Sequence, residues 1–260
     1  MKIGRCFGDF DSGDAVFQSF SDMGYEYLEI PLCAAAGIDD GRLARFRERA
    51  EANRLPIYAS NVFFPGSVPL LGEASDEGMV LDYAGTALRK ASLLGIEIAV
   101  LGSGAARRRP DDMSADEASA GLSDIFGKIA ELASGYGIVI ALEPLNPGET
   151  NTITTSMEGL AMVERVGHTS FKLLLDNYHV NQSGDGFDVV HKAARVLRHC
   201  HLAVVPDRSF PGPGRMDSYA GFFEALRAVG YGGNISVESS FEGEADAGGV
   251  AHLKNLQKEA

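Results

Sequence analysis

The sequence lacks several features that mark specialised classes of protein. It has three cysteines in 260 residues, Cys6, Cys33 and Cys200, and they form no paired motif, so we expect no disulfide framework and a reducing compartment. No stretch approaches the roughly 20 apolar residues of a membrane span. The opening residues, MKIGRCFGDF, contain no unbroken apolar core of a secretion signal. These absences predict a soluble, cytoplasmic protein that does not contact a membrane.

Basic residues are also scarce. Lys and Arg number 23 against 36 Asp and Glu, which leaves a formal net charge of −13. Because a protein that neutralises a phosphate backbone needs a basic face, this charge disfavours nucleic acid as a partner. The one basic run, Arg107-Arg108-Arg109, would be either a solvated loop or a local anchor for a phosphate or carboxylate group on the substrate.

The glycine-rich nucleotide motifs are absent as well. The first predicted strand is followed by CFGDFDSGD rather than by G-x-G-x-x-G, and no G-x-x-x-x-G-K-[ST] occurs anywhere. What recurs instead is a unit made of an amphipathic helical stretch, a glycine and a short apolar run. Examples are ALRKASLLG-IEIAVLGSG and IAELASGYG-IVIALEPL. This repeat predicts alternating helices and strands.

Eight of these apolar runs are predicted to be strands. They cover residues 2–7, 25–30, 56–63, 96–102, 138–143, 171–176, 199–205 and 234–238. Most have no polar face, which is typical of parallel strands that helices cover on both sides. The chain length, the helix-length spacing and the lack of a break in composition predict one α/β domain over residues 1–260, closed as a (β/α)8 TIM barrel.

Polar residues close four consecutive predicted strands. Glu143 ends IVIALE, Asp176 ends FKLLLD, His201 lies in HCHL and Glu238 ends NISVE. The active site of an α/β barrel lies at the carboxyl ends of its strands, so we expect these side chains to converge on the barrel axis. Closely packed carboxylates repel one another unless a cation lies among them. Three oxygen ligands and one nitrogen ligand predict one divalent metal, Mn²⁺ first, with Mg²⁺, Co²⁺ and Zn²⁺ as alternatives.

Strand alternation distinguishes the histidines near this site. His199 and His201 share one face of their strand while Cys200 points to the other, and His201 lies nearer the catalytic end. We therefore interpret His199 as a structural residue behind the site. His179 follows Asp176 by three residues in DNYH, where it would either meet a substrate hydroxyl or be a loop histidine without a role.

Several segments resemble signature stretches of the sugar phosphate isomerase/epimerase family, the xylose isomerase-like TIM barrels that include ketose 3-epimerases and hydroxypyruvate isomerases. They are ALEPLNPGETNTITT, LLLDNYH, HCHLAVVPDRSFPGPGRMD and ISVE in the second half of the chain, and GSGAARRRP after the fourth strand. The resemblance implies an enzyme of carbohydrate metabolism whose partner is a small sugar substrate. It also implies a dimer or tetramer, by analogy alone.

The same resemblance assigns roles to seven residues. It implies four metal ligands, which are Glu143, Asp176, His201 and Glu238. It implies that substrate oxygens are bound by three further residues, which are Glu149, His179 and Arg208. One departure is visible, since the stretch from His201 to Arg208 is one residue longer than in the ketose epimerases.

The residue types fit proton transfer next to a carbonyl group. A carboxylate is a weak base toward a C–H proton, so the enolate oxygen needs stabilisation as it forms, which a chelating metal supplies. Glu143 and Glu238 are then the candidate base and acid on opposite faces of a planar cis-enediolate. The sequence predicts a metal-dependent isomerase or epimerase of a ketose or a small hydroxy-carbonyl compound.

Other functions stay open at this point. An inosose-type dehydratase, which is a lyase, would form the same enolate and expel a hydroxyl. An AP-endonuclease-like hydrolase would share the barrel but need further histidines and a basic surface. A barrel that binds a sugar or a metal without turnover is the last alternative. The segment 61–66, NVFFPG, would offer apolar surface near the barrel mouth or pack against a neighbouring loop or subunit.

Overall fold

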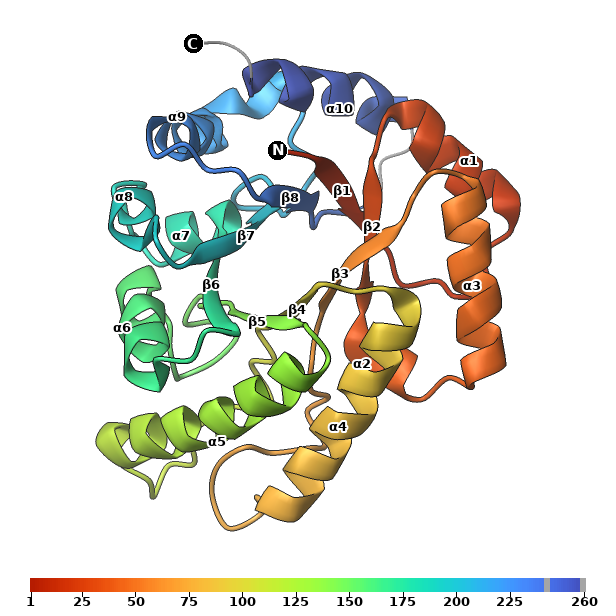
Figure 1. Ribbon diagram of the computed structural model, residues 1–260. Helices are drawn as coiled ribbons and strands as arrows, with labels where there is room; N and C mark the ends of the chain where they lie inside the picture. The colour runs from red at the N-terminus through yellow and green to blue at the C-terminus, as the bar shows by residue number, and fades with distance from the viewer. Residues whose placement is uncertain (241–243, 258–260) are drawn as a thin grey trace.

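The computed structural model describes residues 1–240 and 244–257, and its centre is a closed barrel of eight parallel strands (Figure 1). Each strand pairs with its neighbours in the chain, and β8 pairs with β1. The strands are β1 Ile3–Cys6, β2 Tyr27–Pro31, β3 Ile57–Asn61, β4 Ile98–Leu101, β5 Val139–Leu142, β6 Phe171–Asp176, β7 Leu197–Leu202 and β8 Asn234–Val237. The predicted (β/α)8 barrel is confirmed.

Helices form a ring outside the barrel, and α10 lies between α9 and α1 where the ring closes (Figure 1). They are α1 Asp14–Met23, α2 Leu32–Ala36, α3 Asp40–Ala52, α4 Glu77–Leu94, α5 Ala115–Gly135, α6 Ser156–Val166, α7 Asn177–Gln182, α8 Val189–Ala193, α9 Ala220–Ala228, α10 Glu244–Leu256 and the 3-10 helix η1 Pro213–Ser218. No helix in the described part of the chain has both the length and the apolar character that a membrane crossing requires.

Local sequence signals set the ends of the long helices. Ser114 and Glu117 form a capping box at the start of α5, and Asp76 accepts a hydrogen bond from the backbone of Met79 at the start of α4. Gly95 ends α4 at φ 80°, a left-handed conformation that a side chain would strain. The helix ends therefore follow from residues within a few positions of each end.

One predicted strand is shifted. β7 runs from Leu197 to Leu202, whereas the sequence predicted residues 199–205. The backbone N–H of Ala203 donates to the side chain of Asn177 at 2.9 Å instead of continuing the strand ladder. The apolar residues that follow therefore belong to the loop after β7.

The inside of the barrel has two unlike halves. On β3 to β6 the inward side chains form a small apolar cluster, which consists of Ala59, Ile98, Val100, Ala141 and Leu174. On β2, β7 and β8 the inward side chains are polar and buried, and they are Tyr27, Glu29, His199, His201 and Ser236. Gly4 on β1 makes room for this half, because a Cβ there would lie 2.1 Å from the Tyr27 ring.

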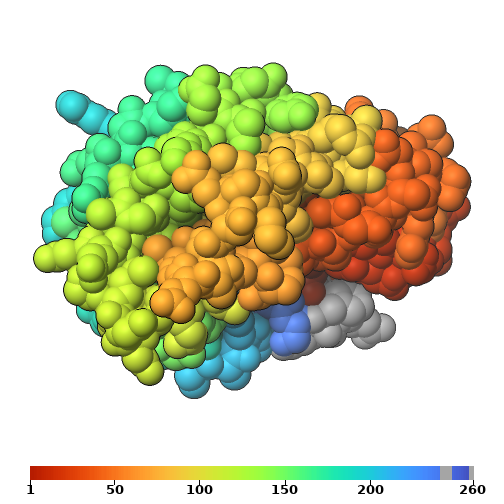
Figure 2. Space-filling model, turned by 90° about the horizontal axis from the view of Figure 1, so that it is seen from below, coloured from red at the N-terminus to blue at the C-terminus, as the bar shows by residue number. Residues whose placement is uncertain are grey.

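Long loops build the rim of the barrel. The segment 62–76 lies side by side with the segment that follows β4, and Figure 2 shows the two in contact on one face of the molecule. The backbone N–H of Leu70 donates to the carbonyl of Ala106 at 2.8 Å, which joins them. The loops after β3 and β4 thus form one wall beside the barrel mouth.

Candidate metal and substrate site

Four predicted ligands meet at the carboxyl end of the barrel. Glu143 and Glu238 directly follow β5 and β8, Asp176 ends β6, and His201 lies in β7. One ligand atom from each of the four lies within 4.8 Å of the other three. His201 Nδ1 is 3.1 Å from a Glu143 carboxylate oxygen and 3.6 Å from one of Glu238. The topology therefore brings together side chains that span almost a hundred residues of sequence.

The three acids differ in how readily they ionise. Burial, followed by the charges of Glu143 and Glu238, raises the pKa of Asp176 to about 7. Burial also raises the pKa of Glu143, against the effect of His201. Burial acts in the same direction on Glu238, but His201 and Arg208 outweigh it and lower the pKa of Glu238 to about 2. At Asp176, the negative charges of Glu143 and Glu238 outweigh the positive charges of His201 and Arg208.

The residues present fit a divalent cation. Asp176 Oδ2 is buried and has no hydrogen-bond partner among the described residues, since the neighbouring nitrogens, of Arg208 and His179, are 3.6 and 3.7 Å away. Glu29 accepts a hydrogen bond from His201 Nε2 at 2.8 Å, which puts a proton on Nε2 and turns Nδ1 toward the carboxylates. A nitrogen lone pair that faces carboxylate oxygens is repelled unless a proton or a cation lies between them. Three carboxylates and one imidazole form a donor set that divalent metals accept.

Two of the three predicted substrate-binding residues, Arg208 and His179, lie against the ligand cluster, and the third, Glu149, contacts Arg208. Arg208 donates to Glu238 at 2.7 Å and to Glu149 at 3.3 Å, and its guanidinium lies over the ring of Tyr178. Its φ of 55° is a left-handed conformation, and with this backbone its guanidinium reaches the Glu238 carboxylate. The roles that the resemblance implies for these residues stay predictions.

His179 presents a neutral ring to the site. Its Nδ1 accepts a hydrogen bond from the backbone N–H of Asn146 at 3.2 Å, so Nε2 carries the ring proton. Burial, followed by the positive charge of Arg208, lowers the pKa of His179 to about 3. Its Nε2 lies 3.4 Å from an Arg208 nitrogen. The His179 Nε2–H and the Arg208 N–H are both donors, so neither can accept from the other. A single acceptor, such as a substrate oxygen, could bind to both.

The arginine run holds loops together. Arg107 is fully buried and donates to the backbone carbonyl of Glu143 at 3.0 Å, so the prediction of a solvated loop is wrong for this residue. Arg108 donates to the backbone carbonyl of Glu149 at 3.0 Å. Both contacts fasten the segment after β5 to the segment after β4. The run therefore supports the loop that carries two site residues.

The comparison with protein families agrees with this architecture. Residues 17–257 match the family model described as xylose isomerase-like TIM barrel. The chain belongs to this family. Figure 1 shows the barrel that the description implies.

Curated relatives of this xylose isomerase-like barrel are epimerases by name. A D-psicose 3-epimerase of Agrobacterium fabrum is 29% identical over 230 residues, which cover 85% of this chain and 77% of that protein. A ketose 3-epimerase of Arthrobacter globiformis is 35% identical over 114 residues, or 44% of this chain. The match spans only 39% of the length of that second relative.

Solved structures share the whole fold. A D-psicose 3-epimerase crystallised in the presence of D-fructose superposes with a TM-score of 0.81 at 21% identity, covering 100% of this chain and 96% of that one. A D-allulose 3-epimerase from Methylomonas sp. in complex with D-allulose has a TM-score of 0.83 at 22% identity, covering 98% and 97%. A family 2 AP endonuclease from Brucella melitensis reaches 0.79 at 21% identity, covering 98% and 99%. At these identities the likeness establishes the fold alone.

Two residues at the site of this family member were not predicted from the sequence. Glu29 on β2 is fully buried and contacts His201 from behind the ligand cluster. Asn61, which ends β3, donates to Glu238 at 3.1 Å. A lone carboxylate inside the apolar stretch YLEI was the available signal for Glu29. No comparable signal marked Asn61.

The segment 61–66 packs inward for the most part. Phe63 and Phe64 are buried, and the backbone N–H of Phe64 donates to the side chain of Ser103 at 2.9 Å. Val62 alone among its apolar residues is exposed, at 41%. Packing against the neighbouring loop, rather than an apolar surface at the mouth, therefore describes this segment.

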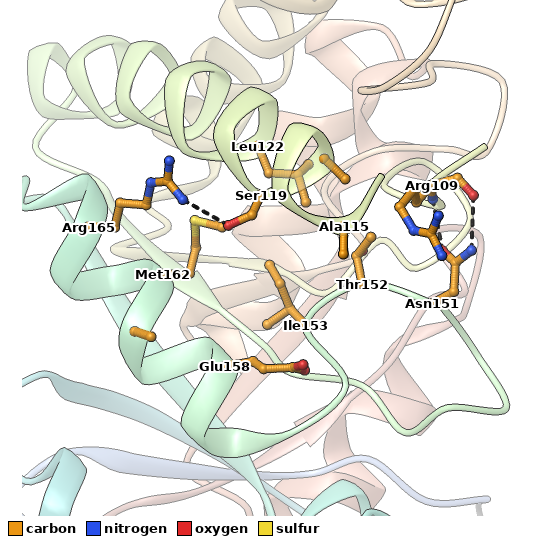
Figure 3. A pocket seen from close by; sticks show the side chains of 12 residues that line it. Arg109, Ala115, Ser119, Leu122, Asn151, Thr152, Ile153, Glu158, Met162 and Arg165 are labelled. Carbon is orange, nitrogen blue, oxygen red and sulfur yellow. Dashed lines mark hydrogen bonds between the residues drawn. The ribbon is translucent and has the colours of Figure 1, made fainter. Parts of the chain in front are cut away.

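A separate cavity of about 260 Å³ lies outside the barrel wall, between α5 and α6 (Figure 3). Leu122 and Met162 line it, with Arg109 and Arg165 toward opposite ends. Both guanidinium groups already donate, Arg109 to a backbone carbonyl and Arg165 to Ser119. None of the four ligands lines this cavity, so we place the chemistry at the barrel mouth.

Proposed function

We propose that this protein is a metal-dependent epimerase of a ketose, or an isomerase of a small hydroxy-carbonyl compound, acting through a cis-enediolate. The observation that carries the proposal is the approach of two carboxylates, Glu143 and Glu238, to His201 Nδ1 at 3.1 and 3.6 Å from different strands. Relatives named as ketose 3-epimerases favour epimerisation over isomerisation.

Four residues would hold the metal in this proposal, and they are Glu143, Asp176, His201 and Glu238. Mn²⁺ is our first choice, because oxygen-rich sites with one imidazole suit it. When bound, the metal supplies electrophilic stabilisation of the negative charge that develops on the substrate oxygen. The protein's part is to hold the ligands around one point and to keep Asp176 ionised when the cation is present.

Proton transfer falls to two of these carboxylates. Glu143 follows β5 and Glu238 follows β8, so they approach the site from different parts of the barrel wall. One removes the proton next to the carbonyl and the other delivers a proton to the opposite face. Delivery to the same carbon yields the epimer. Delivery to the adjacent carbon, together with transfer of the hydroxyl proton to the former carbonyl oxygen, yields the isomer.

Substrate oxygens would be bound by Arg208, His179 and Glu149. Arg208 and His179 offer N–H groups 3.4 Å apart, and Glu149 offers an acceptor on the far side of Arg208. A pair of donors and a carboxylate acceptor match the carbonyl and hydroxyl oxygens of a sugar. These contacts orient the carbon acid between the two proton-transfer groups.

Replacing Arg208 with leucine is expected to lower kcat/KM about 10- to 100-fold, since a charge-assisted hydrogen bond contributes about 1.5–3 kcal/mol. The acid limb of the pH profile should also move to higher pH. Burial and the neighbouring carboxylates raise the pKa of Asp176 to about 7, and the charge of Arg208 opposes that rise. Steady-state kinetics between pH 5 and 9 measure both effects. Arg208→Lys, which retains a charge, is the control and should shift the limb less. An unchanged kcat/KM together with an unshifted acid limb would contradict a role for Arg208 in the reaction.

Solvent exchange tests the proposed reaction directly. The protein is loaded with Mn²⁺ and incubated in deuterium oxide with a panel of unphosphorylated ketoses and hydroxypyruvate. We expect deuterium at the carbon next to the carbonyl and the appearance of an epimer. Absence of exchange across the panel with metal bound would overturn the proposal. A product that has lost a hydroxyl would reassign the protein as a dehydratase.

A further inference from the structure

The polar half of the barrel interior has an ionisable group that the proposed reaction does not use. Glu29 is wholly buried on β2, among side chains that contact one another beneath the site. Burying a carboxylate costs several kcal/mol unless its oxygens are well hydrogen-bonded. An apolar side chain would fill the same position without that cost, as in the apolar half of the barrel. Packing therefore gives no reason for Glu29.

The Glu29 carboxylate accepts every hydrogen bond that it makes among the described residues, and the Cys6 sulfur lies within 4.8 Å of one of its oxygens. Its Oε1 accepts from His201 Nε2 at 2.8 Å. Its Oε2 accepts from His199 Nε2 at 2.8 Å and from the Ser236 hydroxyl at 2.5 Å. The Tyr27 hydroxyl in turn lies 2.9 Å from that of Ser236. Because both oxygens are fixed, the carboxylate cannot turn away from His201.

His201 has one nitrogen at each side of this arrangement. A neutral imidazole carries its proton on either nitrogen, and the partner of one nitrogen decides which. In the neutral ring that a metal ion requires, Glu29 keeps the proton on Nε2, so the lone pair of Nδ1 faces Glu143 and Glu238. A carboxylate that accepts a hydrogen bond from a ligating imidazole also makes the imidazole a more basic metal ligand.

We infer that Glu29 is a positioning residue, which holds His201 in the tautomer and ring orientation that expose Nδ1 to a metal ion, and so sets the affinity of the site. The inference rests on the metal site of the proposed function. It does not depend on which carbonyl compound is turned over. His199 supports Glu29 at its other oxygen. Within residues 1–240 and 244–257, the His199 ring has two hydrogen-bond partners, Glu29 and Ser236, both at Nε2, and its buried Nδ1 has none.

Metal titration of three variants tests the inference. Glu29→Leu removes the acceptor, Glu29→Gln keeps an acceptor but removes the charge, and Ser236→Ala is the matched control, because it removes a donor from Glu29 without touching His201. We expect Mn²⁺ binding to weaken about 10- to 100-fold in Glu29→Leu, which is the usual effect of losing such a partner. The Mn²⁺ affinity of Glu29→Gln should be intermediate. That of Ser236→Ala should stay within about threefold of the wild type, because the contact between Glu29 and His201 is retained.

A second readout separates positioning from folding. In the Zn²⁺-loaded protein, the ring proton of His201 should give a downfield NMR signal on Nε2 that is protected from solvent exchange. This signal should persist in Ser236→Ala and Glu29→Gln. In Glu29→Leu it should exchange rapidly, and if that variant does not fold, Glu29→Gln still reports through its metal affinity.

Two results would overturn the inference. One is wild-type Mn²⁺ affinity in folded Glu29→Gln and Glu29→Leu. The other is a loss of Mn²⁺ affinity in all three variants that is proportional to their loss of thermal stability. Both are distinct from failure of the proposed function, in which the wild-type protein binds Mn²⁺ but exchanges no substrate proton.

Discussion

Replacing Glu238 with glutamine is expected to stop epimerisation while one of the two epimers continues to exchange its proton with solvent. The reason is that each epimer presents its hydrogen to one face, and each face has its own carboxylate, Glu143 or Glu238. Losing one of them removes a proton-transfer group that typically contributes about 10²- to 10⁴-fold in rate. The epimer whose hydrogen faces Glu143 still loses and regains it. Glu143→Gln should show the mirror image, with exchange only in the other epimer.

This experiment compares conversion and deuterium exchange for each pure epimer at saturating Mn²⁺. Saturation matters because both glutamates also belong to the ligand cluster. Asp176→Asn is the control, because Asp176 is a proposed ligand without a proton-transfer role. It should need more metal yet retain exchange in both epimers. Loss of exchange from both epimers in both glutamine variants would contradict the two-carboxylate arrangement.

Removing the metal with a chelator is expected to abolish turnover, and the affinity for added metal should fall as the pH drops below 7. Burial raises the pKa of Asp176 to about 7, so a proton competes for this ligand below that pH. Each displaced proton weakens binding about tenfold for each pH unit. A second proton competes at His201, because burial is outweighed by the charges of Glu29, Glu238 and Glu143, which raise the pKa of this ring well above its usual value. Titration with Mn²⁺ at pH 5.5, 6.5 and 8 measures the slope. A pH-independent affinity would exclude Asp176 as a protonated ligand.

The same pKa shift predicts how the stability of the metal-free protein depends on pH. Asp176 has an ordinary pKa of 3.8 and a folded pKa of about 7, so between these values the folded chain binds a proton that the unfolded chain releases. The free energy of unfolding should therefore fall as the pH rises from 4 to 7 through this group, and the full loss should be present above pH 7. Added metal stabilises by about 2.7 kcal/mol at 100 times its Kd. Thermal melts with and without metal at each pH test this.

The architecture was readable from local patterns. Apolar runs separated by helix-length stretches predict buried parallel strands, because helices must cover both faces of such a sheet. The ligand cluster followed from topology, since every strand of a parallel barrel ends at the same rim. Glu143, Asp176 and Glu238 close their strands, and neighbouring strands bring neighbouring ends together. Order along the chain was sufficient for this inference.

Contacts across the barrel interior could not be predicted from the sequence, because they form only when the barrel closes. Glu29 and His201 are 172 residues apart and lie on strands that are not adjacent, so no periodicity or spacing relates them. The direction of Arg208 depends on a left-handed residue in an irregular loop, and the burial of Arg107 depends on two loops that pack against each other. A linear pattern records which residues alternate along one strand. Which of them meet in the interior is decided by register, barrel curvature and loop packing, because these set the distances between distant parts of the chain.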